Sequence, residues 1–191
     1  MDLTKGTREE KRARAKKMML WFCIISIIMM FAGFTSAYVV SSSRPDWVKD
    51  YQLPNAFVWS TVIIILSSIS LFLSKRSILN NQRKTANGLL LTTFVLGVAF
   101  IVLQFRGFAE IIAHGYYFTG PASTINSSFI YIVVIAHLAH VAGGLIVLLV
   151  LIYNHFKQRY KPGQMLGLEL GATFWHFVDF LWLYLFVFFI S

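Results

Sequence analysis

The sequence predicts an all-α integral membrane bundle of five transmembrane helices. Two observations carry this prediction: the composition of the chain and the length of its apolar runs. Of the 191 residues, 57% are hydrophobic and 13% are charged, whereas an average soluble domain is about 45–50% apolar and about 25% charged. A soluble protein of this length, enough for one compact unit, could not bury so much apolar surface. A lipid bilayer accepts it, because there the apolar surface faces hydrocarbon.

Five apolar runs have the length of a membrane helix, which needs about 20 residues to cross a hydrocarbon core about 30 Å thick. They cover residues 18–40, 57–74, 87–104, 128–153 and 171–190. The runs do not alternate as the strands of a membrane barrel would, and helices satisfy their own backbone hydrogen bonds in lipid. The first run has a basic front like a signal peptide. Its apolar part is over twenty residues long and no A-x-A site follows it, so we interpret it as an anchor. Residues 1–17 are then a basic tail and residues 18–191 the membrane domain.

The loops differ strongly in positive charge, and this difference predicts the orientation. Fourteen lysines and arginines lie in the N-terminal tail and in the second and fourth loops, whereas three lie in the first and third loops. We expect the side with fourteen to be cytoplasmic, with the N-terminus there and the C-terminus outside. This orientation, together with attraction to anionic lipid headgroups, accounts for the net charge of +9. No nucleic-acid partner is expected, because the basic residues lie in short loops tied to the membrane.

Two sequence signals predict where helices begin. Thr7, followed three residues later by Glu10, fits a capping box, so a helix is expected to start in the basic tail and run into the membrane. Before the fourth run, Asn126, Ser127 and Ser128 are residues that can cap a helix.

Polar side chains inside the membrane are costly and therefore informative, and they concentrate in the last two runs. His137 and His140 are three residues apart, and so are His176 and Asp179, while Glu169 precedes His176 by seven; such spacings share one helix face. A charged Asp at a helix centre costs about 3 kcal/mol, so Asp179 must face protein beside a histidine or tyrosine, or be protonated. The helical rise leaves about 4–5 Å in depth between His140 and His176 and about 9 Å between His137 and His176. We therefore expect a structural polar network between the last two helices, with His140 meeting the stripe of the fifth; its members are His137, His140, Glu169, His176 and Asp179.

These residues predict no catalytic, cofactor or metal site in the chain. The three histidines within the membrane have no cluster of Cys or carboxylates to complete a metal site. A bis-histidine haem needs only two histidines on facing helices, so a small membrane cytochrome b is an alternative of a different class. A membrane protease is not favoured, because no G-x-S-x-G motif is present. A transporter would usually show repeats or broken helices, and the sequence has neither.

The last two runs resemble subunit III of haem-copper terminal oxidases, the cytochrome c oxidase subunit 3 family. Residues 169–186 read ELGATFWHFVDFLWLYLF and are similar to the last helix of that family, with Trp175-His176-Phe177-Val178-Asp179 as a specific signal. The segment His137-x-x-His140-Val141-x-x-Gly144 resembles the family's H-x-x-H-V-x-x-G. Weaker similarities lie in Leu96-Gly97, Leu103-Gln104, Glu110, Phe31-Ala32-Gly33 and Ala37-Tyr38-Val39. The resemblance spans roughly residues 19–190.

The chain also departs from the family pattern at three places. The family typically carries a carboxylate where this chain has Ile27, a second glutamate where it has Gly107, and Thr-Gly where it has Val134-Ile135. A role for the mid-membrane carboxylate is therefore not carried over to this chain. Five helices with a basic tail look like the short bacterial form of the family, which lacks the first two of the seven helices in the mitochondrial form.

The resemblance implies a supporting subunit that holds no redox centre. It implies packing against subunit I, with subunits II and IV in the same complex and with haem and copper in the partner catalytic subunits. It also implies phospholipid bound in a cleft, support of proton uptake, protection of subunit I during turnover, and a place in the bacterial inner membrane. Cytochrome c is the expected electron donor and a quinol oxidase is the close alternative. A respiratory supercomplex is a further assembly that the resemblance allows.

Basic residues at helix ends are the expected contacts of lipid headgroups, and Arg83, Lys84 and Arg106 are placed for that role. Small residues four apart, Gly33-x-x-x-Ala37 and Ala139-x-x-x-Gly143, would allow helices to approach closely. Such spacings also occur by chance in many membrane helices.

Overall fold

The computed structural model describes residues 6–45, 47, 53–120, 123–160 and 165–190. Its five helices are α1 (Arg8–Ser41), α2 (Asn55–Leu79), α3 (Arg83–Ala113), α4 (Ile125–Phe156) and α5 (Leu166–Ile190). Each helix contains one of the five apolar runs and is long and apolar enough to span a membrane. The prediction of an all-α bundle with five membrane-spanning helices is confirmed. The limits of the parts embedded in hydrocarbon stay a prediction.

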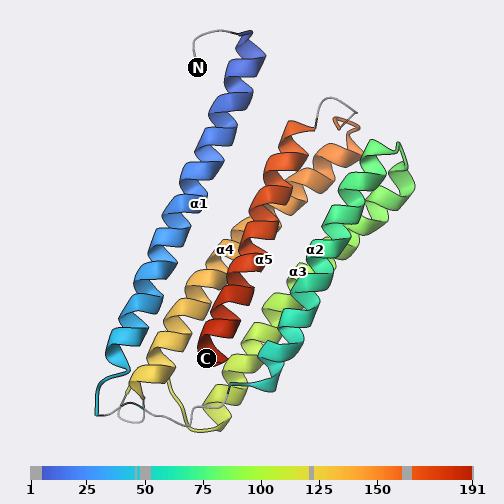
Figure 1. Cartoon of the computed structure of the whole chain (residues 1–191). Coiled ribbons are helices and arrows are strands. Elements are labelled where there is room, and N and C mark those ends of the chain that lie inside the picture. Colours follow the sequence, from blue (N-terminus) through green and yellow to red (C-terminus); the bar gives the residue numbers. More distant parts are fainter. Residues whose placement is uncertain (1–5, 46, 48–52, 121–122, 161–164, 191) are drawn as a thin grey trace.

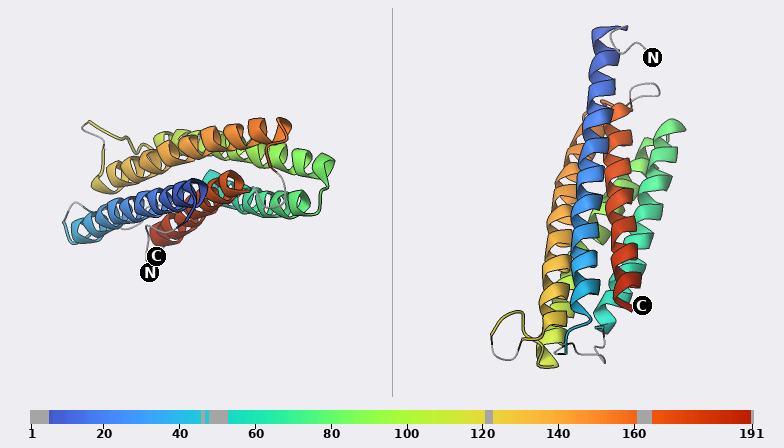
Figure 2. Two further views of the ribbon diagram at one scale, coloured as in Figure 1. Left: turned by 90° about the horizontal axis from the view of Figure 1, so that it is seen from above. Right: turned by 60° about the vertical axis from the view of Figure 1, so that its left-hand side comes forward.

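The helices form two layers (Figures 1 and 2). One layer contains α1, α5 and α2, with α5 in the middle, and the other contains α3 and α4. Helix α5 packs against α1, α2 and α4, and the most extensive helix–helix contact is between α2 and α3. Because α5 is central, its polar residues can face three different neighbours, and only the fold decides which one.

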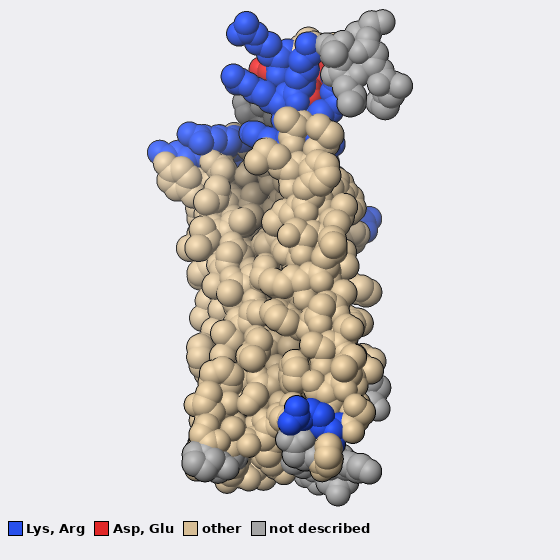
Figure 3. All heavy atoms as spheres, turned by 90° about the vertical axis from the view of Figure 1, so that its left-hand side faces the viewer, with Lys and Arg blue, Asp and Glu red and all other residues tan. Residues whose placement is uncertain are grey.

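Positive charge gathers at one end of the molecule (Figure 3). This end, which we name the basic end, holds the start of α1 and the α2–α3 and α4–α5 connections, while α5 finishes at the opposite end. The middle of the molecule is apolar on its outside, as the large exposed side chains of Trp21, Phe22 and Phe180 illustrate. The distribution matches a membrane protein with charged ends. The assignment of the basic end to the cytoplasm stays a prediction.

Side-chain caps start two of the helices. The predicted capping box of α1 is confirmed, because Glu10 N–H donates to the Thr7 hydroxyl at 3.3 Å and Thr7 N–H donates to the Glu10 carboxylate at 3.0 Å. For α4 the cap is Thr124, with Ser127 as its reciprocal partner. The cap therefore lies two residues before Asn126, because Thr124 is the residue whose extended backbone lets its hydroxyl reach the first free N–H groups.

Helix α1 is attached to the bundle by a single stripe of side chains. Its buried residues are Ile24, Ile27, Phe31 and Thr35, and the helix packs against α4 and α5. The Tyr184 hydroxyl of α5 donates to the Thr35 hydroxyl at 3.2 Å and closes the stripe. An added Cβ at Gly33 would meet no atom within 4 Å. The small face of α1 therefore remains unpaired within the described part of this chain.

Candidate functional site

The polar stripe of α5 that contains Glu169, His176 and Asp179 faces α2. The His176 ring nitrogen Nδ1 shares a hydrogen bond with the Ser68 hydroxyl at 2.5 Å. Ser68, His176 and Asp179 together line a hollow of about 250 Å³ between the two helices. Near the basic end a second hollow, of about 400 Å³, lies between the same helices and is lined by Lys75, Glu169 and again His176. The polar stripe predicted on the fifth helix thus lies along one groove.

Asp179 is the least satisfied polar residue of this groove. Its side chain is 4% exposed, and neither carboxyl oxygen has a hydrogen-bond partner within the described residues. Ser68 lies close to it, but the hydroxyl meets hydrogen-bond geometry only with His176. A buried polar group without a partner is costly, so it requires water, a proton or a group from outside the chain.

The two histidines of α4 lie elsewhere. His140 Nδ1 is within 2.7 Å of the Ala136 carbonyl of its own helix, and its ring lies 5.8 Å from that of Phe31 on α1. His137 is fully buried and packs against aromatic rings, with the centroid of Trp182 at 5.3 Å and that of Phe100 at 6.0 Å. No hydrogen bond in the described structure reaches either ring nitrogen of His137.

The structure therefore groups the predicted residues differently from the expected network. It brings Glu169, His176 and Asp179 to one groove, but the described hydrogen bonds link His176 to α2 and His140 to its own helix. The reason is the rotation of the central helix α5, which presents this stripe to α2 and not to α4. His140 was expected in the network because its depth in the membrane is close to that of His176. Depth does not determine which way a side chain points around its helix.

A stripe of hydroxyls on α2 is the feature that the sequence analysis missed. The Trp175 indole N–H donates to Ser67 at 3.1 Å, and Ser67 donates to the Thr93 carbonyl of α3 at 3.4 Å. Further along, Trp182 donates to Thr61 at 2.9 Å. The signal was present, because Ser60, Ser67 and Ser74 recur every seven residues and so share a face.

Trp175, the first residue of the W-H-F-V-D segment, fits onto two glycines. A Cβ at Gly97 of α3 would lie 2.7 Å from the Trp175 ring, and one at Gly144 of α4 would lie 2.9 Å from it. The two glycines therefore leave the space that the indole fills. This explains physically why the motifs of three helices contain Trp and Gly at these places.

The two departures from the family carboxylates lie in apolar packing. Ile27 is 6% exposed and belongs to a cluster with Phe31, Val133 and Leu185. At Gly107 an added Cβ would collide with the ring of Phe57. Both positions are thus filled with hydrocarbon contacts in this chain, and an acidic side chain fits neither without rearrangement.

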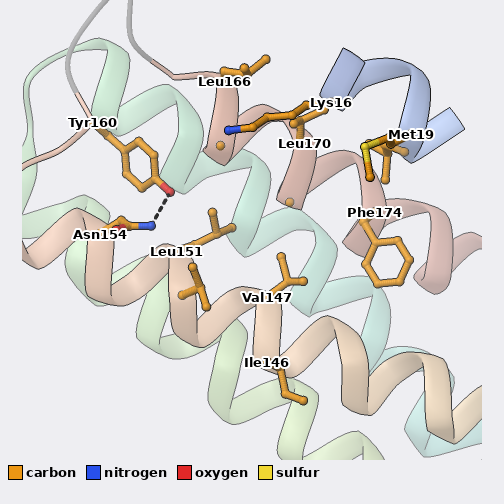
Figure 4. A pocket seen from close by; sticks show the side chains of 14 residues that line it. Lys16, Met19, Ile146, Val147, Leu151, Asn154, Tyr160, Leu166, Leu170 and Phe174 are labelled. Carbon is orange, nitrogen blue, oxygen red and sulfur yellow. Dashed lines mark hydrogen bonds between the residues drawn. The ribbon is translucent and has the colours of Figure 1, made fainter. Parts of the chain in front are cut away.

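A large cavity lies between α1, α4 and α5 near the basic end (Figure 4). It measures about 580 Å³ and is mainly apolar, with Lys16, Asn154 and Tyr160 as its polar lining. Burial raises the pKa of Tyr160 above its ordinary value of 10.0, and Asn154 donates to its hydroxyl at 3.5 Å. The expected headgroup contacts lie elsewhere: Arg83 and Lys84 begin α3, and Arg106 is exposed toward the other end of α3.

The positions of His140 and His176 do not suit the binding of one haem between them. His140 contacts α1 and His176 contacts α2, and these helices flank α5 on opposite sides (Figure 2). The two histidines therefore do not face one another as axial ligands of one haem must. Among the residues described, no group of three metal-ligating side chains comes together.

Comparison with known proteins gives one family. The family model "Cytochrome c oxidase subunit III" matches residues 4–191. Among the similar proteins, the cytochrome bo(3) ubiquinol oxidase subunit 3 of Pseudomonas putida is 27% identical over 87% of this chain and 80% of its own length. The cytochrome c oxidase subunit 3 of Rhipicephalus sanguineus is 31% identical over 90% of this chain and 68% of its own length. That of Papio hamadryas is 28% identical over 86% of this chain, which spans 64% of the Papio protein.

The family match covers all five helices, and the fold gives a packing reason for the family's most specific motifs. The chain belongs to the cytochrome c oxidase subunit III family, whose members are membrane subunits of multi-subunit haem-copper oxidases.

Proposed function

We propose that this chain supports subunit I of a proton-pumping oxidase in a bacterial inner membrane. It packs directly against subunit I, shares the complex with subunits II and IV, and leaves haem and copper to its partners. The observation that carries the proposal is the engagement of its membrane histidines in the packing of the chain itself: His137 lies among aromatic rings, His140 on its own helix and His176 on Ser68. These are the contacts of a structural subunit.

Purification in mild detergent through a tag on this chain tests the proposal. We expect the other oxidase subunits to co-purify and the complex to show haem bands, while the chain expressed alone is colourless. A reduced-minus-oxidised haem band in the isolated chain that disappears on replacing His140 or His176 would instead support the membrane cytochrome.

We propose two alternative electron donors, because this chain is similar both to subunits of cytochrome c oxidases and to subunits of ubiquinol oxidases. Cytochrome c is the donor that we put first, and the ubiquinol oxidase name of the Pseudomonas putida relative supports the second. Donor docking belongs to other subunits. Oxygen consumption by the purified complex with reduced cytochrome c, and separately with a ubiquinol, distinguishes the two.

We also propose that the chain holds phospholipid. Two features support this. Basic residues lie at helix ends, namely Arg83, Lys84 and Arg106, and Lys16 borders an apolar cavity. An acyl chain suits the apolar walls, and the ammonium group suits a phosphate. Lipid retained by the purified complex can be quantified by mass spectrometry.

In that measurement Lys16→Glu should lower the retained phospholipid, and Lys17→Glu is the matched control because Lys17 does not line the cavity. Equal retention in both variants would remove Lys16 from the lipid site. A well-resolved complex with side chains, and no lipid, throughout the interface would contradict the lipid role altogether.

A further inference from the structure

Two hollows follow one another along the groove between α2 and α5. The outer hollow, at the basic end, is lined by Lys75, Arg76 and Glu169, and the inner hollow by Ser68 and Asp179. His176 lines both. Asp179 is ten residues from Glu169 along α5, which is about 15 Å of helix. The groove therefore leads from the charged end of the bundle to a carboxyl group deep in the membrane region.

The hollows have the size that water needs, and each presents polar groups on a mainly apolar lining. A water molecule occupies about 30 Å³ and needs two to four polar partners, and the hollows measure about 250 and 400 Å³. In the inner hollow the carboxyl oxygens of Asp179 have no partner among the described residues, and Ser68 and His176 stand beside them. The outer hollow carries the charged groups of Lys75, Arg76 and Glu169 on a lining that also includes Thr173 and apolar side chains.

We propose that the α2–α5 groove is a hydrated inlet through which Asp179 exchanges its proton with water at the basic end. In this step the Asp179 O–H bond breaks, the proton passes to a groove water, and the carboxylate is left hydrated beside Ser68 and His176. The reverse step returns the proton. No redox partner is involved, so the inlet does not depend on the electron donor or on the supporting role proposed above.

Cysteine accessibility tests the inlet in membranes that contain the full complex. Cys23 is replaced by Ser, and Ser68→Cys is compared with Leu73→Cys, using an anionic methanethiosulfonate that cannot cross lipid. Leu73 is 42% exposed on the outside of α2, and it lies about 7.5 Å closer to the basic end than Ser68. If depth in the membrane alone decided the rate, the control Leu73→Cys would therefore react faster than Ser68→Cys.

We expect Ser68→Cys to react at least tenfold faster than Leu73→Cys, and only with reagent added on the side of the basic end. Filling the outer hollow through Thr173→Trp, at an exposed lining residue, should slow the reaction of the Ser68→Cys thiol by a similar factor. Equal or slower reaction at position 68 would overturn the inlet, because the groove would then be filled by lipid or protein.

Infrared spectroscopy gives a second measurement that needs no cysteine. At a pH low enough to protonate Asp179, its carboxylic C=O band is identified by its loss in Asp179→Asn. On transfer to heavy water we expect this band to shift promptly in the unmodified protein and more slowly in Thr173→Trp. A band that keeps its position in heavy water, or shifts equally fast in both proteins, would overturn the proposal.

Discussion

Two adjacent glycines of α4 offer a strict test of how Trp175 holds the bundle. An alanine Cβ at Gly144 would lie 2.9 Å from the Trp175 ring, whereas one at Gly143 would meet no atom within 4 Å. Both substitutions gain the same helix propensity, about 0.5–1 kcal/mol for Gly→Ala. The difference between them is therefore the packing term, and forcing an extra methyl into a filled core costs about 1–3 kcal/mol.

We expect Gly144→Ala to be less stable than Gly143→Ala by about 1–3 kcal/mol. The free energy of unfolding is measured for the purified full chain in detergent by titration with a denaturing detergent, followed by tryptophan fluorescence or circular dichroism. Trp175→Phe provides the second half of a double-mutant cycle, because a phenyl ring leaves room beside Gly144. When Gly144→Ala is combined with Trp175→Phe, its penalty should shrink.

Equal stability of the two alanine variants would refute this reasoning. So would a penalty of Gly144→Ala that stays unchanged when Trp175 is replaced, because the contact with the indole would then not be its cause.

Three further outcomes are expected. Ile27→Glu should sharply reduce the amount of chain in the purified complex, because burying a charge at this depth costs about 3 kcal/mol. The control is Ile27→Val, which should cost only about 0.5–1.5 kcal/mol of stability. Equal incorporation of both variants would contradict the apolar role of this site. His176→Ala and Asp179→Ala should weaken retention of the chain and shorten turnover while the redox chemistry persists; full retention with immediate loss of all oxygen consumption would contradict a supporting role. Reporters fused to the two ends of the chain should lie on opposite sides of the membrane, with the N-terminal one in the cytoplasm, and two ends on one side would contradict an odd number of spans.

Composition and run length were enough for the fold class. Lipid imposes a simple rule on every segment, since each must satisfy its own backbone hydrogen bonds and present apolar side chains. Five runs of the right length therefore become five helices whatever the rest of the sequence does. The capping box of Thr7 and Glu10 was equally readable, because it is a contact between residues three apart.

The sequence also identified the polar residues of the site, but it did not identify the residues that they contact. The polar side chains Glu169, His176 and Asp179 were evident as costly groups at helical spacing, and the motif around Trp175 was evident by resemblance. Their position along the helix follows from residue number and the fixed rise per residue. The partner across the interface does not follow from either.

Only the tertiary structure decided that this stripe faces α2. The choice depends on how α5 is rotated, and that rotation is set by the fit of Trp175 against Gly97 and Gly144 and by the bond from Trp182 to Thr61. These contacts join residues on four different helices. Packing of this kind depends on side chains that are brought together in space from distant parts of the chain. The sequence read along its length therefore determines which helices form and where each polar group lies along its helix. The fold alone determines what each polar group contacts.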